Sequence, residues 1–121
     1  EGESAFEGTH SIEKELLAIC AEEIMDAPSG GYDGYVASGG TEANVQALWM
    51  YRNFFMEQFA DEARHVGVLY SADSHYSFYK ASNILQIQAI EVPVDPSDRQ
   101  MTLMAYEQSV RRAQANGVRA L

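Results

Sequence analysis

The sequence predicts a three-layer α/β protein, in which helices pack on both faces of a mainly parallel sheet. Segments with helical apolar spacing alternate with short apolar segments of strand length along the 121 residues. Residues 66–70 are apolar at nearly every position, as expected for a strand that helices cover on both faces. No hairpin turn signal joins two strands, so parallel pairing across helical connections is favoured.

Helices and strands are expected in the order α-β-α-β-α-β-α. The predicted helices span about 11–26, 41–59, 75–85 and 103–116, and the predicted strands span 32–37, 66–70 and 87–94. Ser11 is the predicted N-cap of the first helix, whose apolar side chains recur every three or four residues. Gly117 is expected to end the last helix in the left-handed conformation. Residues 118–121 resemble the beginning of a further strand, which suggests a chain truncated within a larger sheet.

The composition excludes several classes of function. The formal net charge is −10, from 18 acidic and 8 basic residues, and no basic cluster offsets it, so nucleic-acid binding is not expected. No apolar segment approaches membrane-spanning length, and no signal peptide opens the chain. One cysteine and three scattered histidines indicate neither a disulfide nor a metal site. We therefore expect a soluble, acidic, cytoplasmic domain.

The segment 38–44, Ser-Gly-Gly-Thr-Glu-Ala-Asn, follows the first predicted strand and opens a helix. Ligands of open α/β sheets bind at this edge, where Gly39 and Gly40 allow close approach of an anion. The helix start offers free N–H groups, and the Thr41 hydroxyl adds a donor. The alternative to anion binding is a tight turn in which Thr41 only caps the helix, which accounts for the same residues. No lysine follows the second glycine, so a nucleotide P-loop is not favoured.

The segment 73–81 occupies the equivalent position after the next predicted strand. Its loop is therefore expected beside the glycine segment, with His75 directed towards the ligand of that segment. An imidazole can stack on a flat ring and exchange protons near neutral pH. The alternative is a histidine at a helix start with capping contacts only.

Together, the two segments resemble the group II pyridoxal-5'-phosphate (PLP)-dependent amino-acid decarboxylases, closest to histidine and serine decarboxylase-like members. Residues 34–44 resemble the phosphate loop of that family, and residues 74–81 resemble its ring-stacking segment. Residues 92–95, Met101 and Tyr106 match the strand and helix that follow. The resemblance covers nearly the whole chain.

The resemblance implies part of the large domain of a fold-type I enzyme, which binds PLP at a homodimer interface. Gly40 and Thr41 would hold the cofactor phosphate, and Gly39 would give clearance. His75 would stack on the pyridine ring and contact a small amino-acid substrate. The implied reaction is loss of the α-carboxylate as CO₂.

The lysine and the acidic residue that such an enzyme requires are not recognised in this sequence. Lys14 and Lys80 do not match the family's Schiff-base context, and Asp73 and Asp95 are misplaced for the ring nitrogen. Residues 1–121 are therefore expected to be a partial PLP-binding large domain, without the Schiff-base lysine region and the C-terminal small domain. The chain alone is expected to be inactive.

Three alternatives stay open. The first keeps PLP but changes the reaction, to an aminotransferase or another PLP lyase, because phosphate and ring contacts are shared across reactions. The second is a non-catalytic α/β domain that binds a phosphorylated ligand. The third is an interaction fragment with no ligand. The sequence does not identify the amino-acid substrate.

Overall fold

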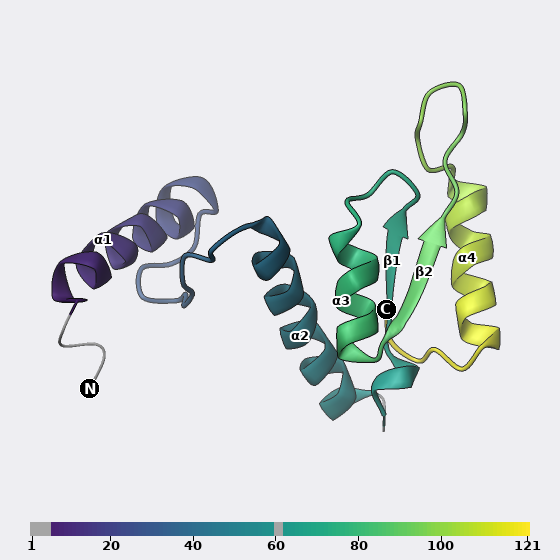
Figure 1. Ribbon diagram of the computed structural model, residues 1–121, viewed down its shortest axis with the longest axis horizontal. Coiled ribbons are helices and arrows are strands. Elements are labelled where there is room, and N and C mark those ends of the chain that lie inside the picture. Colours follow the sequence, from purple (N-terminus) through teal and green to yellow (C-terminus); the bar gives the residue numbers. More distant parts are fainter. Residues whose placement is uncertain (1–5, 60–61) are drawn as a thin grey trace. The chain divides into compact units, whose positions relative to one another are not determined.

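The computed structural model describes residues 6–59 and 62–121, in two compact units, Glu1–Ser38 and Gly39–Leu121. The second unit contains a parallel sheet. Strands β1 (Gly67–Ser71) and β2 (Gln88–Val92) pair in register, and α3 (Ser77–Leu85) connects them (Figure 1). This connection is the strand–helix–strand unit that the sequence predicts.

Helices cover both faces of this sheet. α2 (Gly40–Gln58) and α3 pack together on one face, and α4 (Leu103–Ala115) packs on the other. Val68 belongs to the apolar cluster beneath α2, whereas the next residue, Leu69, belongs to the cluster beneath α4. Because successive side chains of a strand point to opposite faces, the two clusters lie on opposite sides of the sheet. The predicted α/β class and the three layers are confirmed.

The elements of the second unit begin and end within two residues of their predicted positions. Gly117 has a φ of 88°, which confirms the predicted left-handed end of α4. Residues 118–121 run parallel to β1, on the side away from β2. There Ala120 pairs with Val66 and accepts the Gly67 N–H at 2.9 Å. This single parallel bridge lies where the sequence predicts the beginning of a further strand, but the described residues 118–121 do not form a strand.

The first helix of the first unit begins earlier than predicted. α1 spans Glu7–Ala18 and continues as a π-helical segment, Ile19–Ile24. Phe6 is the N-cap, so the predicted cap at Ser11 is wrong. The residues before Ser11 also take helical angles, and Glu7 in the first turn complements the helix dipole.

The strand predicted at 32–37 is wrong: these residues form no strand in the structure. Side chains take the place of a neighbouring strand as hydrogen-bond partners. The Val36 N–H donates to Glu13 Oε2 at 2.9 Å, and the Tyr32 hydroxyl donates to Glu22 Oε1 at 2.8 Å. That bond, together with the negative charge of Glu22, raises the pKa of Tyr32. An apolar segment becomes a strand only where another strand can pair with it.

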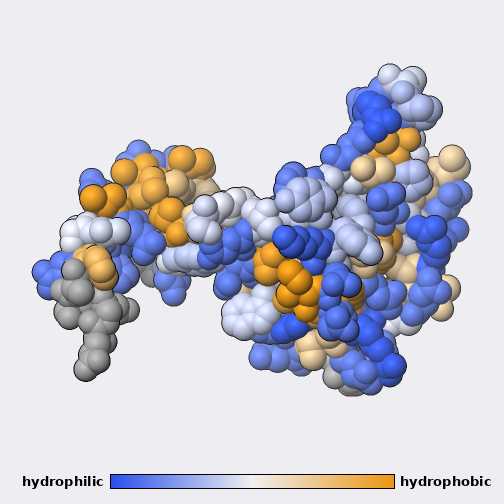
Figure 2. All heavy atoms as spheres, in the orientation of Figure 1, coloured by the Kyte–Doolittle hydropathy of each residue, from blue (hydrophilic) through white to orange (hydrophobic). Residues whose placement is uncertain are grey.

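The predicted apolar face of α1 is exposed in the described structure. Ile12, Leu16 and Ile19 are exposed, as is Ile24 at the end of the π-helical segment. Figure 2 shows apolar side chains gathered over this part of the chain. Ala21 is the one buried residue of the two helical segments. None of the described helices is both long enough and apolar enough to cross a bilayer.

Candidate functional site

The glycine segment forms the amino-terminal end of α2. Gly39 is the N-cap, with an extended backbone (φ 176°, ψ 168°), and Gly40 is the first helical residue. No side chain of the described residues caps this helix. Thr41 is the second helical residue and not the N-cap, so the interpretation in which Thr41 only caps the helix is wrong.

Open space surrounds the two glycines. A methyl group at the Cβ position of Gly39 or Gly40 would meet no atom of the described structure within 4 Å. The first turn of a helix presents N–H groups that have no partner within the helix, together with the positive end of its dipole. An uncapped start with space in front of it has the properties of an anion site.

His75 lies between the carboxyl end of β1 and the start of α3. Its Nδ1 is 2.9 Å from Ser77 Oγ, and the Ser77 N–H donates to the same nitrogen at 3.3 Å. The centroid of its ring is 4.3 Å from that of Tyr76, with 39° between the ring planes. The imidazole is exposed: Ser77 holds its Nδ1 edge, the Tyr76 ring lies against it, and its other nitrogen is not engaged by these contacts.

One hydrogen bond joins the two predicted segments. Asn44 Nδ2, one turn into α2, donates to Ser77 Oγ at 2.9 Å. The packing of α2 against α3 makes this contact possible across 33 positions of sequence. The structure thus brings the glycine segment and the His75 segment together at one edge of the sheet. Sequence reasoning included Asn44 and Ser77 in the motifs but assigned them no role.

Asp73, in the loop that carries His75, is paired with Arg99. Its carboxylate forms an ion pair with the Arg99 guanidinium, including a bond from Arg99 Nε at 2.9 Å. The hydrogen bond and the charge of Asp73 raise the pKa of Arg99. Arg99 has a φ of 62° and lies in the turn that follows β2. The pair therefore fastens that turn to the loop that carries His75.

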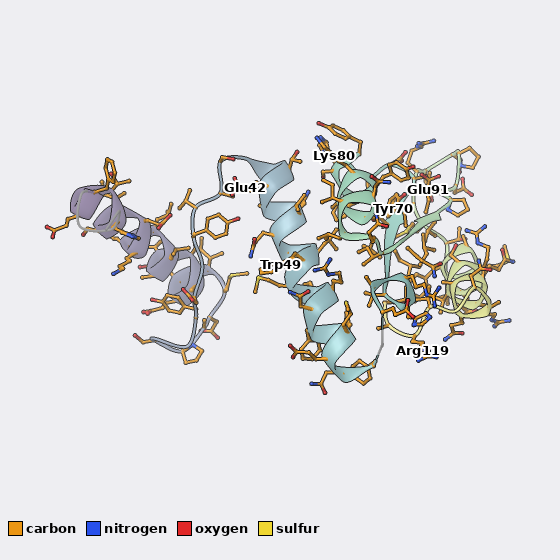
Figure 3. All side chains as sticks on the ribbon, turned by 60° about the horizontal axis from the view of Figure 1, so that its bottom comes forward. Glu42, Trp49, Tyr70, Lys80, Glu91 and Arg119 are labelled. Atoms are coloured by element: carbon orange, nitrogen blue, oxygen red, sulfur yellow. The ribbon has the colours of Figure 1, made fainter. Side chains whose placement is uncertain are left out.

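Two lysines and a tyrosine–glutamate pair take no part in the contacts described above. Lys80 is exposed on α3 (Figure 3), and Lys14 belongs to α1. Figure 3 also labels Tyr70 and Glu91, which are register partners on the neighbouring strands β1 and β2. Burial, and then the charge of Glu91, raises the pKa of Tyr70. Residues 6–59 and 62–121 contain no group of three or more histidine, cysteine, aspartate or glutamate residues that could hold a metal ion.

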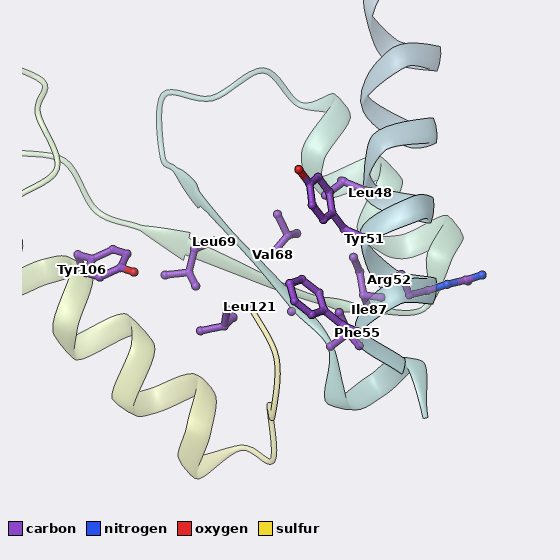
Figure 4. A pocket seen from close by; sticks show the side chains of 11 residues that line it. Leu48, Tyr51, Arg52, Phe55, Val68, Leu69, Ile87, Tyr106 and Leu121 are labelled. Atoms are coloured by element: carbon purple, nitrogen blue, oxygen red, sulfur yellow. The ribbon is translucent and has the colours of Figure 1, made fainter. Parts of the chain in front are cut away.

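An apolar hollow of the second unit is a different feature. It has a volume of about 340 Å³ and lies between α2, β1, Tyr106 and Leu121 (Figure 4). Its lining includes Leu48 and Phe55 of α2, but no residue of 38–44 or 73–81. Its lining is mainly apolar, so it does not have the character of a phosphate site.

Comparison with known proteins identifies decarboxylases as relatives. The chain is 40% identical over 112 residues to a tryptophan decarboxylase from Clostridium sporogenes, a match that covers 93% of the chain and 27% of the relative. It is 36% identical over 87 residues to serine decarboxylase 3 of Oryza sativa, covering 70% of the chain and 18% of the relative. It is 37% identical over 97 residues to a probable L-tyrosine/L-aspartate decarboxylase of Methanoculleus marisnigri, covering 80% and 24%. No protein-family model matches. The chain spans about a quarter of the length of the first curated relative it matches.

Proposed function

Since this chain is related to a segment of the group II amino-acid decarboxylases, we propose that its parent protein removes the α-carboxylate of an L-amino acid as CO₂, with pyridoxal 5'-phosphate as cofactor. The observation that carries the proposal is the Asn44–Ser77 hydrogen bond. It joins an uncapped helix start, suited to a phosphate, to the loop of a histidine suited to a flat ring. A phosphate attached to an aromatic ring matches both features.

The cofactor phosphate would bind at the start of α2. The N–H groups of Gly40 and Thr41 and the Thr41 hydroxyl would donate to its oxygens, and Gly39 would leave room for it. The structure offers two features that fit this role: the absence of a side-chain cap and the open space at both glycines. The dipole of this 19-residue helix would favour the negative charge.

His75 would position the ring of the cofactor and the amino-acid substrate. When bound, the cofactor supplies an electron sink for the pair of electrons that the departing carboxylate leaves behind. The His75 imidazole would stack on the flat ring, and its Nε2 would hold a proton beside the reacting carbon. These roles need a ring held in one orientation, which the two bonds from Ser77 to Nδ1 provide.

Further parts of the catalyst would lie outside this chain. Neither Lys80, which is exposed on α3, nor Lys14 of α1 matches the Schiff-base context of the family. We therefore assign residues 1–121 to part of the large domain, and expect the Schiff-base lysine, the acidic partner of the ring nitrogen and the small domain in other parts of the parent protein. The parent would act in the cytoplasm as a homodimer.

The reaction is tested with the full-length parent protein, PLP and a panel of L-amino acids. Release of CO₂ together with the corresponding amine is the expected result. Formation of a 2-oxo acid without CO₂ would instead indicate an aminotransferase. Binding of PLP without turnover of any amino acid would leave only a phospholigand-binding domain, and the proposed reaction would be wrong.

The phosphate assignment is tested with Thr41→Ala, and Thr41→Ser is the control because it keeps the hydroxyl. Loss of one hydrogen bond to a charged group costs about 1.5–3 kcal/mol, so the PLP dissociation constant should rise at least tenfold. Unfolding of the apoprotein should change little, because Thr41 is not the N-cap. Spectroscopic titration with PLP measures the first quantity and urea unfolding the second. Equal affinity in Thr41→Ala and the parent would contradict the assignment.

The role of His75 is tested with His75→Phe and His75→Ala. Phenylalanine retains a flat ring but no nitrogen, so the two variants separate stacking from proton handling. We expect PLP binding to survive better in His75→Phe than in His75→Ala, and turnover to fall in both. Full turnover in His75→Ala would exclude the proposed role.

A further inference from the structure

We propose that Asn44 and Ser77 are positioning residues that fix the orientation and the tautomer of His75 through a directed chain of hydrogen bonds. The chain runs from Asn44 Nδ2 to Ser77 Oγ, and from Ser77 Oγ to His75 Nδ1. The consequence for catalysis rests on the function proposed above, whereas the consequence for the imidazole itself does not.

The direction of the chain follows from the Ser77 backbone. A backbone N–H can only donate, and the Ser77 N–H is directed at His75 Nδ1 at 3.3 Å. Nδ1 must therefore be the acceptor nitrogen, which places the hydrogen of the neutral imidazole on Nε2. The ring thus presents a hydrogen-bond donor on the side away from Ser77.

The Ser77 hydroxyl supports the same tautomer. Its oxygen accepts from Asn44 Nδ2 at 2.9 Å, and its own hydrogen is then free to point at Nδ1, also at 2.9 Å. An amide that donates therefore makes the hydroxyl a donor towards the histidine. This polarity comes from Asn44, because a side chain that could only accept would reverse it.

Burial of Ser77 makes this chain effective. The residue is fully buried, at 0% exposure, so water does not compete for its hydroxyl. A buried hydroxyl without a partner is costly, which favours the single arrangement that satisfies all three groups. The histidine itself is exposed, so its ring is held from within the fold and offered to the outside.

The chain of hydrogen bonds also couples the glycine segment to the His75 segment. Asn44 lies one turn after Gly40 and Thr41 on α2, whereas Ser77 and His75 lie at the start of α3. A change in position of α2 relative to α3 would break the 2.9 Å bond between them. The orientation of His75 therefore depends on the same helix that would hold the phosphate.

Nitrogen NMR of the histidines tests the proposal directly. In the full-length protein labelled with ¹⁵N-histidine, the long-range proton–nitrogen pattern should identify His75 as the Nε2–H tautomer, in the presence and absence of PLP. Ser77→Ala and Asn44→Ala weaken or remove the hydroxyl donor but keep the backbone N–H of residue 77, so they should shift its nitrogen signals part of the way towards the average of two tautomers. The matched control is Ser82→Ala, the same change at a serine of α3 that is 1% exposed and bonds to the Phe78 carbonyl instead.

Asn44→Asp tests the polarity and Asn44→Leu tests the bond alone. A carboxylate at position 44 can only accept, so it would take the Ser77 hydroxyl hydrogen and remove the donor to Nδ1. We expect a larger change in the His75 nitrogen signals for Asn44→Asp than for Asn44→Leu. Equal signals in Asn44→Asp, Ser77→Ala and the parent protein would overturn the proposal. So would an equal change in Ser82→Ala.

Kinetics separate this inference from the proposed function. If both hold, kcat should fall about tenfold in Ser77→Ala with little change in KM, because a misaligned group costs turnover more than binding. If the His75 signals change in Ser77→Ala but His75→Ala keeps full turnover, the hydrogen-bond chain is retained and the catalytic role of His75 is rejected. If the His75 signals do not change in Ser77→Ala but His75→Ala loses turnover, the hydrogen-bond chain is rejected and the catalytic role of His75 is retained.

Discussion

Gly39 is an N-cap without a side chain, and its extended backbone is open to any residue. Serine and aspartate are preferred N-caps because their side-chain oxygens accept the N–H groups of the first turn. At Gly39 such an oxygen would occupy the donors that we assign to the phosphate. Stability and cofactor affinity should therefore respond in opposite directions to substitution at this one position.

We expect Gly39→Ser to leave the protein equally stable or more stable, by a few tenths of a kcal/mol, while PLP affinity falls. Gly39→Asp should lower the affinity further, since its charge repels the phosphate. Urea unfolding and PLP titration measure the two effects. Gly8→Ala is the control for a change in a first helical turn, because nothing lies within 4 Å of that position either. Unchanged PLP affinity in Gly39→Asp would place the phosphate elsewhere.

Asp95 shows how a single side chain makes stability depend on pH. The Ser97 hydroxyl and the Ser97 N–H, the latter at 2.7 Å, donate to its carboxylate. These bonds lower the pKa of Asp95 below the usual 3.8. A carboxyl group with a lowered pKa stabilises the fold above the pKa of the unfolded chain, and this contribution disappears as the pH falls through the folded pKa.

In Ser97→Ala the pKa of Asp95 should move back towards 3.8, because the hydroxyl donor is lost. The free energy of unfolding should then depend less on pH below about pH 4. Carbon NMR of the carboxyl group during an acid titration measures the pKa. Ser74→Ala is a matched control outside this turn, and an unshifted Asp95 in Ser97→Ala would contradict the assigned cause.

At the scale of elements, α4 has complete terminal signals. The Thr102 side chain accepts the Ala105 N–H at 3.1 Å, and Gly117 follows the helix with a φ of 88°. α2 has neither a side-chain cap at its start nor a left-handed glycine at its end. Thus α4, for which we propose no ligand, is capped by a side chain. In contrast, α2, which we propose binds the phosphate, is not.

Thr102→Ala should destabilise the fold by about 1 kcal/mol, the usual cost of losing an N-cap side chain. Thr102→Ser keeps the accepting oxygen and should restore most of the stability. Chemical unfolding of the two variants against the parent gives the comparison. If the alanine and serine variants lost stability equally, the hydroxyl would not be the group responsible.

At the scale of the whole chain, burial differs between the two units. In the first unit, Ala21 is the one buried residue of the described helical segments. The second unit holds two apolar clusters, one around Val66, Leu85 and Ile87 and the other around Ile90, Ala113 and Val118. Since local stability follows buried apolar contact, the units should open independently.

Amide hydrogen exchange of the 121-residue chain should therefore be fast in α1 and slow in β1 and β2. The amides of α1 have helical hydrogen bonds but little burial, so local fraying exposes them. Exchange followed by NMR measures the difference residue by residue. Comparable protection of α1 and β2 would show that the exposed apolar face of α1 is covered in solution.

Much of the second unit could be predicted from the sequence, because each of its elements carries its own signal. Apolar spacing located α2, α3 and α4, the apolar segment 66–70 located β1, and Gly117 located a helix end. The family resemblance followed from two motifs in order, and the similarity to known decarboxylases supports it. The proposed roles of Gly39, Gly40, Thr41 and His75 stay predictions.

Contacts between distant residues were decided only by the tertiary structure. Residues 32–37 have the composition of a strand, but a strand requires a partner strand. In the structure the Val36 N–H bonds to Glu13 and the Tyr32 hydroxyl bonds to Glu22 instead. Asn44 and Ser77 are 33 positions apart, and their bond depends on how α2 packs against α3. The sequence by itself determined the local elements, since their hydrogen bonds close within a few residues. The arrangement around His75 depends on packing between elements, which no local pattern specifies.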